Sequence, residues 1–292
     1  MIGAPVAADG RCGRGSGLRQ LDGKCAVVTG AARGLGRATA VAFAAEGADL
    51  VLLDIAADVP RVGYPLGTPS QLEHTAELCR GLGASVLCAR ADVRDTEAVA
   101  RAVDDGLARF GQLDVLVNNA GVAAPSGKAA HEITDDEWQF MLDVDLSGAF
   151  RVTRAVVPGM IARRAGSVVN VSSTAGMVGY RHFAGYVAAK HGLIGLTRAC
   201  ALDYAPFQVR VNALCPGSVR DDERMEGRML AEIARSLDVP VADHEALFSQ
   251  SQPMNRLVGP EDVAAAAVWL ASDASRQVTG TVLPVDGGFT TR

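Results

Sequence analysis

The chain has 292 residues, 49% of them apolar, and its formal net charge of −5 arises from 28 basic and 33 acidic side chains. This apolar fraction can build a substantial core. The negative net charge does not indicate the basic surface that is typical of a nucleic-acid-binding protein. No apolar run approaches the ~18 residues that a membrane span needs, and residues 1–20 lack the apolar stretch of a secretory signal. We therefore expect a cytoplasmic protein with a flexible N-terminal tail.

The spacing of cysteine and histidine gives no sign of a metal site. None of the six cysteines forms a Cys-x-x-Cys pair, and the five histidines show no ligand spacing. This pattern favours the reduced thiols of a cytoplasmic protein over a disulfide framework. We expect no bound metal.

Short β-branched runs alternate along the chain with segments long enough for one helix each. This alternation predicts an α/β fold with a doubly wound, mostly parallel sheet. The strands are continuously apolar, as expected where helices cover both faces. No linker or repeat interrupts the series, so we expect a single Rossmann-type domain over residues 21–292. The seven predicted strands are residues 25–29, 48–54, 84–92, 113–118, 166–172, 208–214 and 281–285.

Two connections, residues 55–70 and 218–254, are longer than usual for such a fold. Long excursions in a compact domain are usually functional or disordered. The first ends in Thr68, Pro69 and Gln71, a capping-box pattern with proline at the first helical position, which predicts an ordered helix.

The first predicted strand leads into a glycine-rich turn, "TGAARGLG". Gly30, Gly34 and Gly36 would let the backbone approach a pyrophosphate at a helix N-terminus, although such a turn can also be purely structural. The spacing is not the usual Gly-x-Gly-x-x-Gly. It is Gly-x-x-x-Gly-x-Gly, which resembles the short-chain dehydrogenase/reductase family.

Asp54 ends the second predicted strand, where its carboxylate can accept hydrogen bonds from a ribose and repel a 2′-phosphate. Arg33 is a counter-signal because an arginine could pair with that phosphate. We weigh Asp54 more heavily and expect NAD as the cofactor. The resemblance implies further cofactor contacts from Leu35, Asp92, Val93, Asn119, Ala120, Gly121, Pro216, Gly217 and Val219.

A tyrosine and a lysine stand four positions apart in "GYVAAKHG", in a chain that has only three lysines. On a helix, Tyr186 and Lys190 share a face. The ammonium would lower the tyrosine pKa, so that the phenol can exchange a proton with an alcohol. Lysine suits this site because its compact ammonium can also donate to the cofactor ribose. Ser173, at the end of the fifth predicted strand, could donate to the substrate oxygen.

Ser-x12-Tyr-x3-Lys matches the catalytic pattern of short-chain dehydrogenases, and the resemblance extends over nearly the whole chain. Two positions depart from it. Asp145 replaces the usual asparagine, whose main-chain carbonyl is thought to hold a relay water, and its carboxylate would offset part of the pull of Lys190 on Tyr186. Arg220 and Asp221 follow "PGSV", where a threonine often holds the nicotinamide amide.

The segment after the sixth predicted strand contains Met225, Met229, Ile233 and Leu237 at four-residue intervals, which predicts an amphipathic helix. This helix is either a lid over an apolar substrate or ordinary packing on the core. The predicted helix over residues 186–205 is apolar around much of its circumference and favours a homo-oligomer. The resemblance implies a tetramer.

The insert at residues 55–70 resembles that of actinobacterial short-chain enzymes of the carveol dehydrogenase type, which are associated with the peptide-derived redox carrier mycofactocin. We expect this insert to fold over the adenosine end of NAD and to slow its exchange. The sequence therefore predicts an NAD-dependent oxidoreductase that interconverts a secondary alcohol and a ketone. An NADP-linked carbonyl reductase and a nicotinamide-binding regulator weakened by Asp145 remain as alternatives.

Overall fold

Strands and helices alternate along the chain as the sequence predicts. The computed structural model describes residues 19–240 and 243–291, so most of the tail expected over residues 1–20 lies outside the described residues. The strands are β1 (Cys25–Thr29), β2 (Asp49–Asp54), β3 (Val86–Arg90), β4 (Val115–Asn118), β5 (Gly166–Val171), β6 (Val209–Pro216) and β7 (Val282–Val285).

The described strands form one seven-stranded sheet in the order β3-β2-β1-β4-β5-β6-β7. Every pairing in it is parallel. Val28 of β1 pairs with Leu52 on one side and Val117 on the other. The strand order reverses between β1 and β4, and this is where doubly wound sheets bind ligands beyond the carboxyl ends of their strands. The predicted fold class is confirmed.

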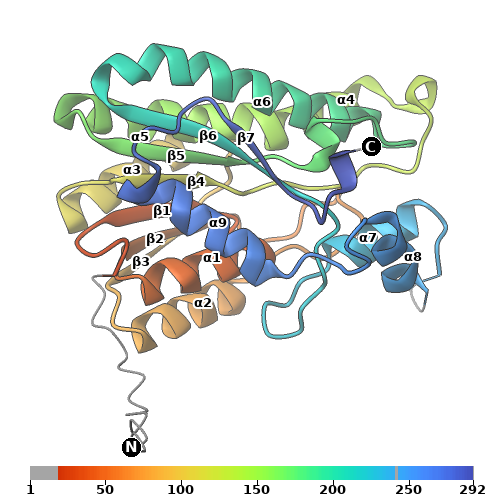
Figure 1. Cartoon of the computed structure of the whole chain (residues 1–292), viewed down its shortest axis with the longest axis horizontal. Helices are drawn as coiled ribbons and strands as arrows, with labels where there is room; N and C mark the ends of the chain where they lie inside the picture. The colour runs from red at the N-terminus through yellow and green to blue at the C-terminus, as the bar shows by residue number, and fades with distance from the viewer. Residues whose placement is uncertain (1–18, 241–242, 292) are drawn as a thin grey trace, which may run out of the picture.

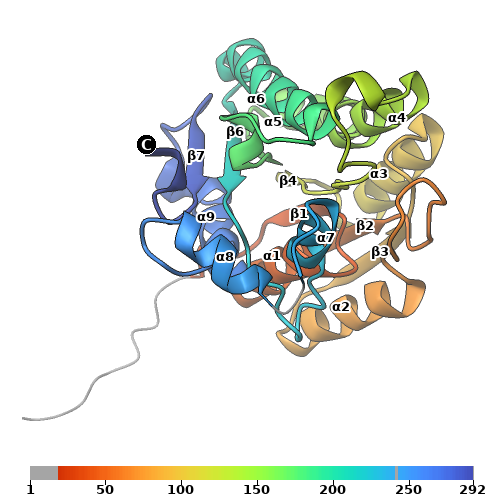
Figure 2. The ribbon, with the colours of Figure 1, turned by 90° about the vertical axis from the view of Figure 1, so that its right-hand side faces the viewer.

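Helices cover both faces of the sheet (Figures 1 and 2). On one face α1 and α9 pack together beside α2, and on the other α3, α4, α5 and α6 form a second layer. Val28 is buried in the first core and its neighbour Val27 in the second, which explains why the strands are apolar without alternation. The helices are α1 (Gly34–Ala45), α2 (Pro69–Gly81), α3 (Thr96–Phe110), α4 (Asp135–Leu142), α5 (Gly148–Arg163), α6 (Ala184–Tyr204), α7 (Met229–Ser236), α8 (His244–Ser251) and α9 (Pro260–Ala271).

The predicted capping box at the end of the insert is present. The Thr68 hydroxyl accepts a hydrogen bond from the Gln71 amide at 3.2 Å, and the Gln71 side chain accepts one from the Thr68 amide at 3.0 Å. These bonds fix the start of α2, the helix to which the insert returns.

The helix predicted in the second excursion is shorter than its four-residue repeat suggested. Only Met229 and Ile233 of the repeat lie within α7, while Leu237 is its C-cap residue. Met225 lies in the preceding loop, where its carbonyl accepts a hydrogen bond from the Gly34 amide at 2.6 Å. The long-range contact with the glycine loop takes the place of a first helical turn. Both α7 and α8 sit beyond the carboxyl ends of the strands (Figure 1).

Candidate active site

A pocket lies at the carboxyl end of the sheet, between the two long excursions. It is lined by the glycine loop, the insert, the ends of β4, β5 and β6, the start of α6 and the α7 region. Every predicted site residue except Gly36 lines it. A Cβ atom at Gly36 would lie 1.9 Å from the Gly30 carbonyl oxygen, so Gly36 supports the glycine loop from beneath.

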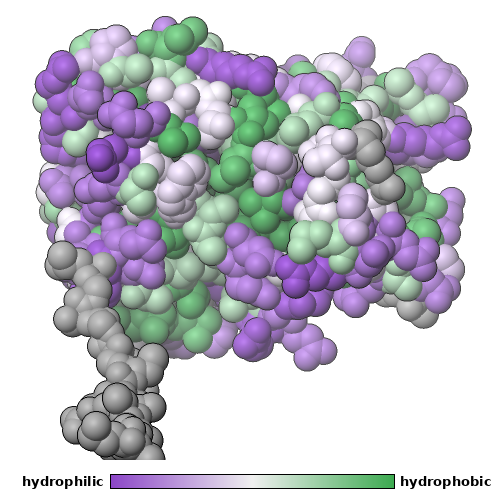
Figure 3. All heavy atoms as spheres, in the orientation of Figure 1, coloured by the Kyte–Doolittle hydropathy of each residue, from purple (hydrophilic) through white to green (hydrophobic). Residues whose placement is uncertain are grey.

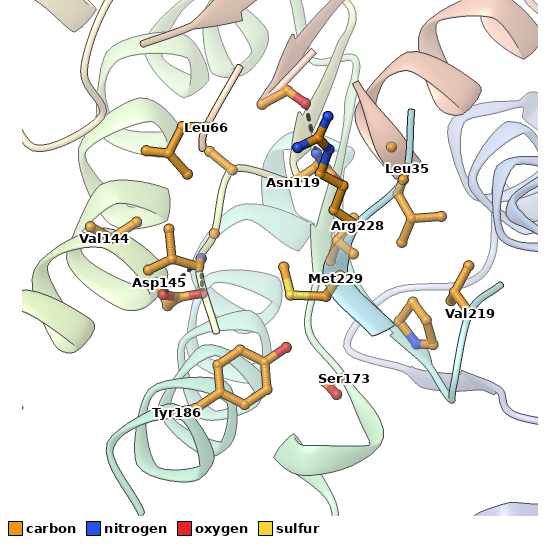
Figure 4. Close-up of a pocket in the computed structure, with 18 of the residues that line it drawn as sticks. Leu35, Leu66, Asn119, Val144, Asp145, Ser173, Tyr186, Val219, Arg228 and Met229 are labelled. Atoms are coloured by element: carbon orange, nitrogen blue, oxygen red, sulfur yellow. Dashed lines mark hydrogen bonds between the residues drawn. The ribbon is translucent and has the colours of Figure 1, made fainter. Parts of the chain in front are cut away.

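The three predicted catalytic side chains meet in this pocket. Ser173 lies two residues after the end of β5, and its hydroxyl accepts a hydrogen bond from the Ala175 amide at 3.1 Å. Tyr186 and Lys190 lie one turn apart on α6, with the Lys190 Nζ 5.5 Å from the centre of the Tyr186 ring. Figure 4 shows the hydroxyl groups of Tyr186 and Ser173 facing the same cavity. A substrate oxygen between them could exchange a proton with one and accept a hydrogen bond from the other.

Lys190 is held in place by a buried ion pair. Its Nζ lies 3.2 Å from Asp145 Oδ1 and donates to the Val171 carbonyl, also at 3.2 Å. The Asp145 carboxylate in turn accepts from the Val122 amide at 3.2 Å. A Cβ atom at Gly121 would lie 2.5 Å from Asp145 Oδ1, so only glycine leaves room for the pair.

Asp145 lies in a segment where the helical backbone widens. Residues Asp143–Ser147 form a π-helical segment between α4 and α5. Such segments are rare and often lie at functional sites. The sequence singled out Asp145 as a departure from the family pattern, and the structure shows that it is an ion-pair partner of Lys190.

Burial is the largest influence on the pKa values of this cluster. Burial raises the pKa of the Tyr186 phenol, and the Asp145 charge raises it further. The Lys190 charge and a hydrogen bond with Ser173 lower this pKa, but by less than burial raises it. Burial also raises the pKa of Asp145, against the effects of Lys190 and the Val122 amide. For Lys190, burial lowers the pKa, but the charges of Asp145 and Tyr186 together raise it above its ordinary value. The lysine therefore stays protonated at neutral pH.

At the other end of the pocket, Asp54 closes β2 beside the glycine loop. Its two carboxylate oxygens accept hydrogen bonds from the Ala32 amide at 2.9 Å and the Ala56 amide at 2.8 Å. Burial raises its pKa, whereas these two amides and Arg33 lower it. Asp54 is thus fixed in position, with further lone pairs available for a ribose hydroxyl.

Arg33 connects the glycine loop to the insert. Its guanidinium donates to the Pro65 carbonyl at 2.7 Å, and its pKa is lowered by burial and by the nearby charge of Arg228. This bond holds Arg33 toward the insert, which weakens the case that it serves a 2′-phosphate.

The insert forms one wall of the pocket, with Val59, Tyr64 and Leu66 among its lining residues. The Tyr64 hydroxyl accepts a hydrogen bond from the Ala123 amide at 3.1 Å, beyond the "NNAG" turn. The insert thus extends past Asp54 to the loop after β4. Figure 4 shows Leu66 on the same side of the cavity as Val144.

The loops after β3 and β4 complete the nucleotide side. Asp92 and Val93 line the pocket, and the Asp92 carboxylate pairs with Arg94, which has no local signal in the sequence. Asn119 donates from its side chain to the carbonyls of Thr29 at 2.9 Å and Gly30 at 3.2 Å, which ties the "NNAG" turn to the glycine loop.

The end of β6 and the loop after it show what Asp221, part of the second departure from the family pattern, does in the structure. Pro216, Gly217 and Val219 line the pocket as predicted. The Asp221 carboxylate accepts hydrogen bonds from the amides of Leu230 at 3.2 Å and Ala231 at 2.9 Å. It therefore fixes the start of α7, where amides have no acceptor within the helix.

Residues of α7 and α8 and of the loop before α7 also line the pocket. Figure 4 shows Arg228 and Met229 pointing into the cavity from the start of α7. Leu230, Ile233 and Phe248 also line it. Met229 and Ile233 were part of the predicted repeat, but Arg228 and Phe248 had no local signal, because their role depends on how the excursion folds back.

The pocket fits a nicotinamide dinucleotide on its own geometry. The amides of Leu35 and Gly36, in the first turn of α1, have no acceptor within the helix and can receive a pyrophosphate. Asp54 stands at one end and Ser173, Tyr186 and Lys190 at the other. Among the described residues, no group of three or more side chains is placed to hold a metal ion.

Known proteins of the same class share this architecture. The family model described as Enoyl-(Acyl carrier protein) reductase matches residues 30–290. Together with the glycine loop and the Ser173, Tyr186 and Lys190 cluster, this match shows that the chain belongs to the short-chain dehydrogenase/reductase family. The predicted family is confirmed.

Individual relatives narrow the comparison. The chain is 38% identical over 276 residues to (-)-trans-carveol dehydrogenase of Rhodococcus erythropolis, covering 94% of this chain and 99% of the relative. It is 39% identical over 267 residues to cis-4-hydroxycyclohexanecarboxylate dehydrogenase of Sinomonas cyclohexanicum, covering 91% and 96%. A crystal structure of carveol dehydrogenase from Mycobacterium avium in complex with NAD has a TM-score of 0.87 and 39% identity, covering 94% and 99%. The expected resemblance to the carveol dehydrogenase type is confirmed.

Proposed function

We propose that this short-chain dehydrogenase uses NAD to interconvert a secondary alcohol and a ketone. The observation that carries the proposal is the meeting of Ser173, Tyr186 and Lys190 at one end of a pocket whose other end holds Asp54. NAD supplies the hydride acceptor or donor when bound. The relatives named as dehydrogenases of carveol and hydroxycyclohexanecarboxylate support an alcohol as the substrate.

The protein's contribution to the reaction is proton transfer and charge stabilisation. In the oxidation, ionised Tyr186 removes the hydroxyl proton of the alcohol, and the Ser173 hydroxyl donates a hydrogen bond to the same oxygen. Lys190 stabilises the phenolate through its positive charge. In the reduction, Tyr186 returns the proton to the substrate oxygen.

The site favours an apolar substrate. Met229, Leu230 and Ile233 of α7 line the pocket together with Phe183 and Phe248. This arrangement supports the lid hypothesis for residues 218–254 over ordinary packing on the core. An apolar alcohol would be shielded from water by these side chains, and its hydroxyl would find its polar partners at Ser173 and Tyr186.

The test is turnover of apolar secondary alcohols with NAD, with Tyr186→Phe as the matched inactive control. Reduction of NAD by the parent protein but not by the variant is the expected result. If the parent binds NAD yet turns over no member of a broad alcohol and ketone panel, it is a nicotinamide-binding regulator instead. Higher affinity for NADP than for NAD would identify the alternative, an NADP-linked carbonyl reductase.

We further infer that bound NAD exchanges slowly and that mycofactocin, or a carrier of its kind, reoxidises it. Support comes from the insert, which lines the pocket beside Asp54 and is bonded to Arg33 and to the Ala123 amide. The protein should then retain NAD through gel filtration and speed up when an artificial electron acceptor is added. Shortening residues 55–70 should restore ordinary turnover with free NAD. Purification without nucleotide and simple saturation by NAD would contradict this inference.

A cytoplasmic homo-oligomer, of four subunits by family resemblance, is the proposed form of the protein. Large apolar side chains lie exposed on several helices: Leu202 of α6 is 80% exposed, Phe150 of α5 44% and Trp269 of α9 37%. Figure 3 shows apolar side chains reaching the surface on the face that carries β7 and α9. Light scattering of the purified protein would measure the subunit number. Among the described residues, no helix is long and apolar enough to span a membrane.

A further inference from the structure

Arg228 differs from the other arginines that line the pocket. Arg33 donates to the Pro65 carbonyl, Arg94 pairs with Asp92, and Arg220 lies 3.5 Å from Glu261. The Arg228 side chain is exposed, and no hydrogen bond or ion pair holds it among the residues that the structure describes. Figure 4 shows it pointing into the cavity. A free guanidinium aimed into a ligand pocket is placed to bind an anion of the ligand.

The surroundings of Arg228 specify which anion this is. Arg33, on the glycine loop, is close enough for the Arg228 charge to lower its pKa, so two cations face the same part of the pocket. The two carboxylates nearest to it along the chain have other partners: Glu226 pairs with Arg37, and Glu232 pairs with Arg235. The first-turn amides of α1 at Leu35 and Gly36 point to the same region. Two arginines and a helix N-terminus match a doubly charged pyrophosphate.

The loop before Arg228 is fixed against the glycine loop. The Met225 carbonyl accepts from the Gly34 amide at 2.6 Å, and Glu226 Oε1 pairs with the fully buried Arg37 at 2.8 Å. Glu226 also accepts a hydrogen bond from the Gln71 side chain at the start of α2. Arg228 thus follows a segment that is held beside the glycine loop.

We propose that Arg228 is a cofactor-binding residue that clamps the NAD pyrophosphate from the α7 side of the pocket. Because Met229, Leu230 and Ile233 follow it directly and line the substrate half of the pocket, binding of the pyrophosphate also positions the apolar wall over the substrate. The proposal rests on NAD as the cofactor.

The test compares Arg228→Gln with Arg224→Gln, which makes the same charge change in the same segment. Arg224 is a matched control because its side chain is 81% exposed and lies near Asp222. Calorimetry should measure binding of ADP-ribose, which contains the pyrophosphate, and of adenosine, which lacks it. We expect Arg228→Gln to weaken ADP-ribose binding about 10- to 100-fold, as for a charge-assisted hydrogen bond. Arg224→Gln should change it by less than about twofold, as expected for a screened surface charge.

Adenosine binding should be the same in both variants and the parent, and Arg228→Lys should restore part of the ADP-ribose affinity. If Arg228→Gln and Arg224→Gln lose the same ADP-ribose affinity, the loss arises from the overall charge and not from a contact of Arg228. A loss for adenosine as large as for ADP-ribose would mean that Arg228 only shapes the α7 region. If Arg228→Gln loses affinity for NADP but keeps its affinity for NAD and ADP-ribose, Arg228 binds the 2′-phosphate instead. Each of these results overturns the proposal, whereas failure of the parent to bind NAD would instead overturn the proposed function.

Discussion

Asp145 Oδ1 lies 3.2 Å from Lys190 Nζ, and both side chains are almost fully buried. The pair joins the π-helical segment before α5 to the N-terminal half of α6. Because the two groups are in contact, the effect of the Lys190 charge on Tyr186 is combined with that of the Asp145 carboxylate. The family pattern, with asparagine at this position, lacks that negative charge. The ionisation of Tyr186 is therefore sensitive to the charge of residue 145.

Asp145→Asn should shift the pH dependence of alcohol oxidation to lower pH. Oxidation needs ionised Tyr186, so activity rises as pH passes through the tyrosine pKa. The Asp145 charge raises that pKa, and its removal lowers it while Lys190 remains positive. The pH profile of kcat should therefore show its rising limb at lower pH than in the parent. A superimposable profile would show that Asp145 is not charged in the working enzyme.

Tyr186→Phe should abolish turnover and leave NAD binding largely unchanged. The substitution removes the proton carrier but keeps the ring that packs beside Phe183. General acid–base groups contribute about 10²- to 10⁴-fold, so less than about a tenth of the parent activity should remain. Steady-state kinetics and NAD titration measure the two properties separately. Greater residual activity would exclude Tyr186 as the proton carrier.

Asp54→Ala should shift cofactor preference from NAD toward NADP. The carboxylate disfavours a 2′-phosphate, and its removal leaves Arg33 nearby. The ratio of the two dissociation constants is the measurement. Asp54→Asn is a useful companion because its side-chain oxygen can still accept a hydrogen bond while the charge is absent. An unchanged ratio in both variants would show that Asp54 does not face the adenosine ribose.

Glu226→Gln should destabilise the contact between α1, α2 and the loop before α7. Glu226 is the carboxylate partner of Arg37, which is fully buried, and it is itself about a third exposed, at 36%. A hydrogen bond to a charged group contributes about 1.5–3 kcal/mol, and partial exposure places this one near the lower end. Thermal unfolding should show a lower Tm, and bound NAD should dissociate faster. Glu223→Gln is the control, since the exposed Glu223 carboxylate makes none of these contacts, and an equal effect there would contradict the prediction.

The sequence by itself determined the order of strands and helices and the glycine loop, and with the family resemblance it predicted the candidate site residues Ser173, Tyr186 and Lys190. These features follow from local periodicity and short spacings, such as the single turn between Tyr186 and Lys190 on α6. The same local signals predicted the capping box that begins α2.

Only the tertiary structure decided how the excursions meet the site. The four-residue repeat predicted a longer helix than α7, because periodicity does not show that the Met225 carbonyl bonds to Gly34 in the glycine loop. The roles of Asp221 at the start of α7 and of Tyr64 at the Ala123 amide likewise depend on how the chain folds back. Spacing along a sequence reports contacts within one element, whereas contacts between distant segments depend on how the whole domain packs around them.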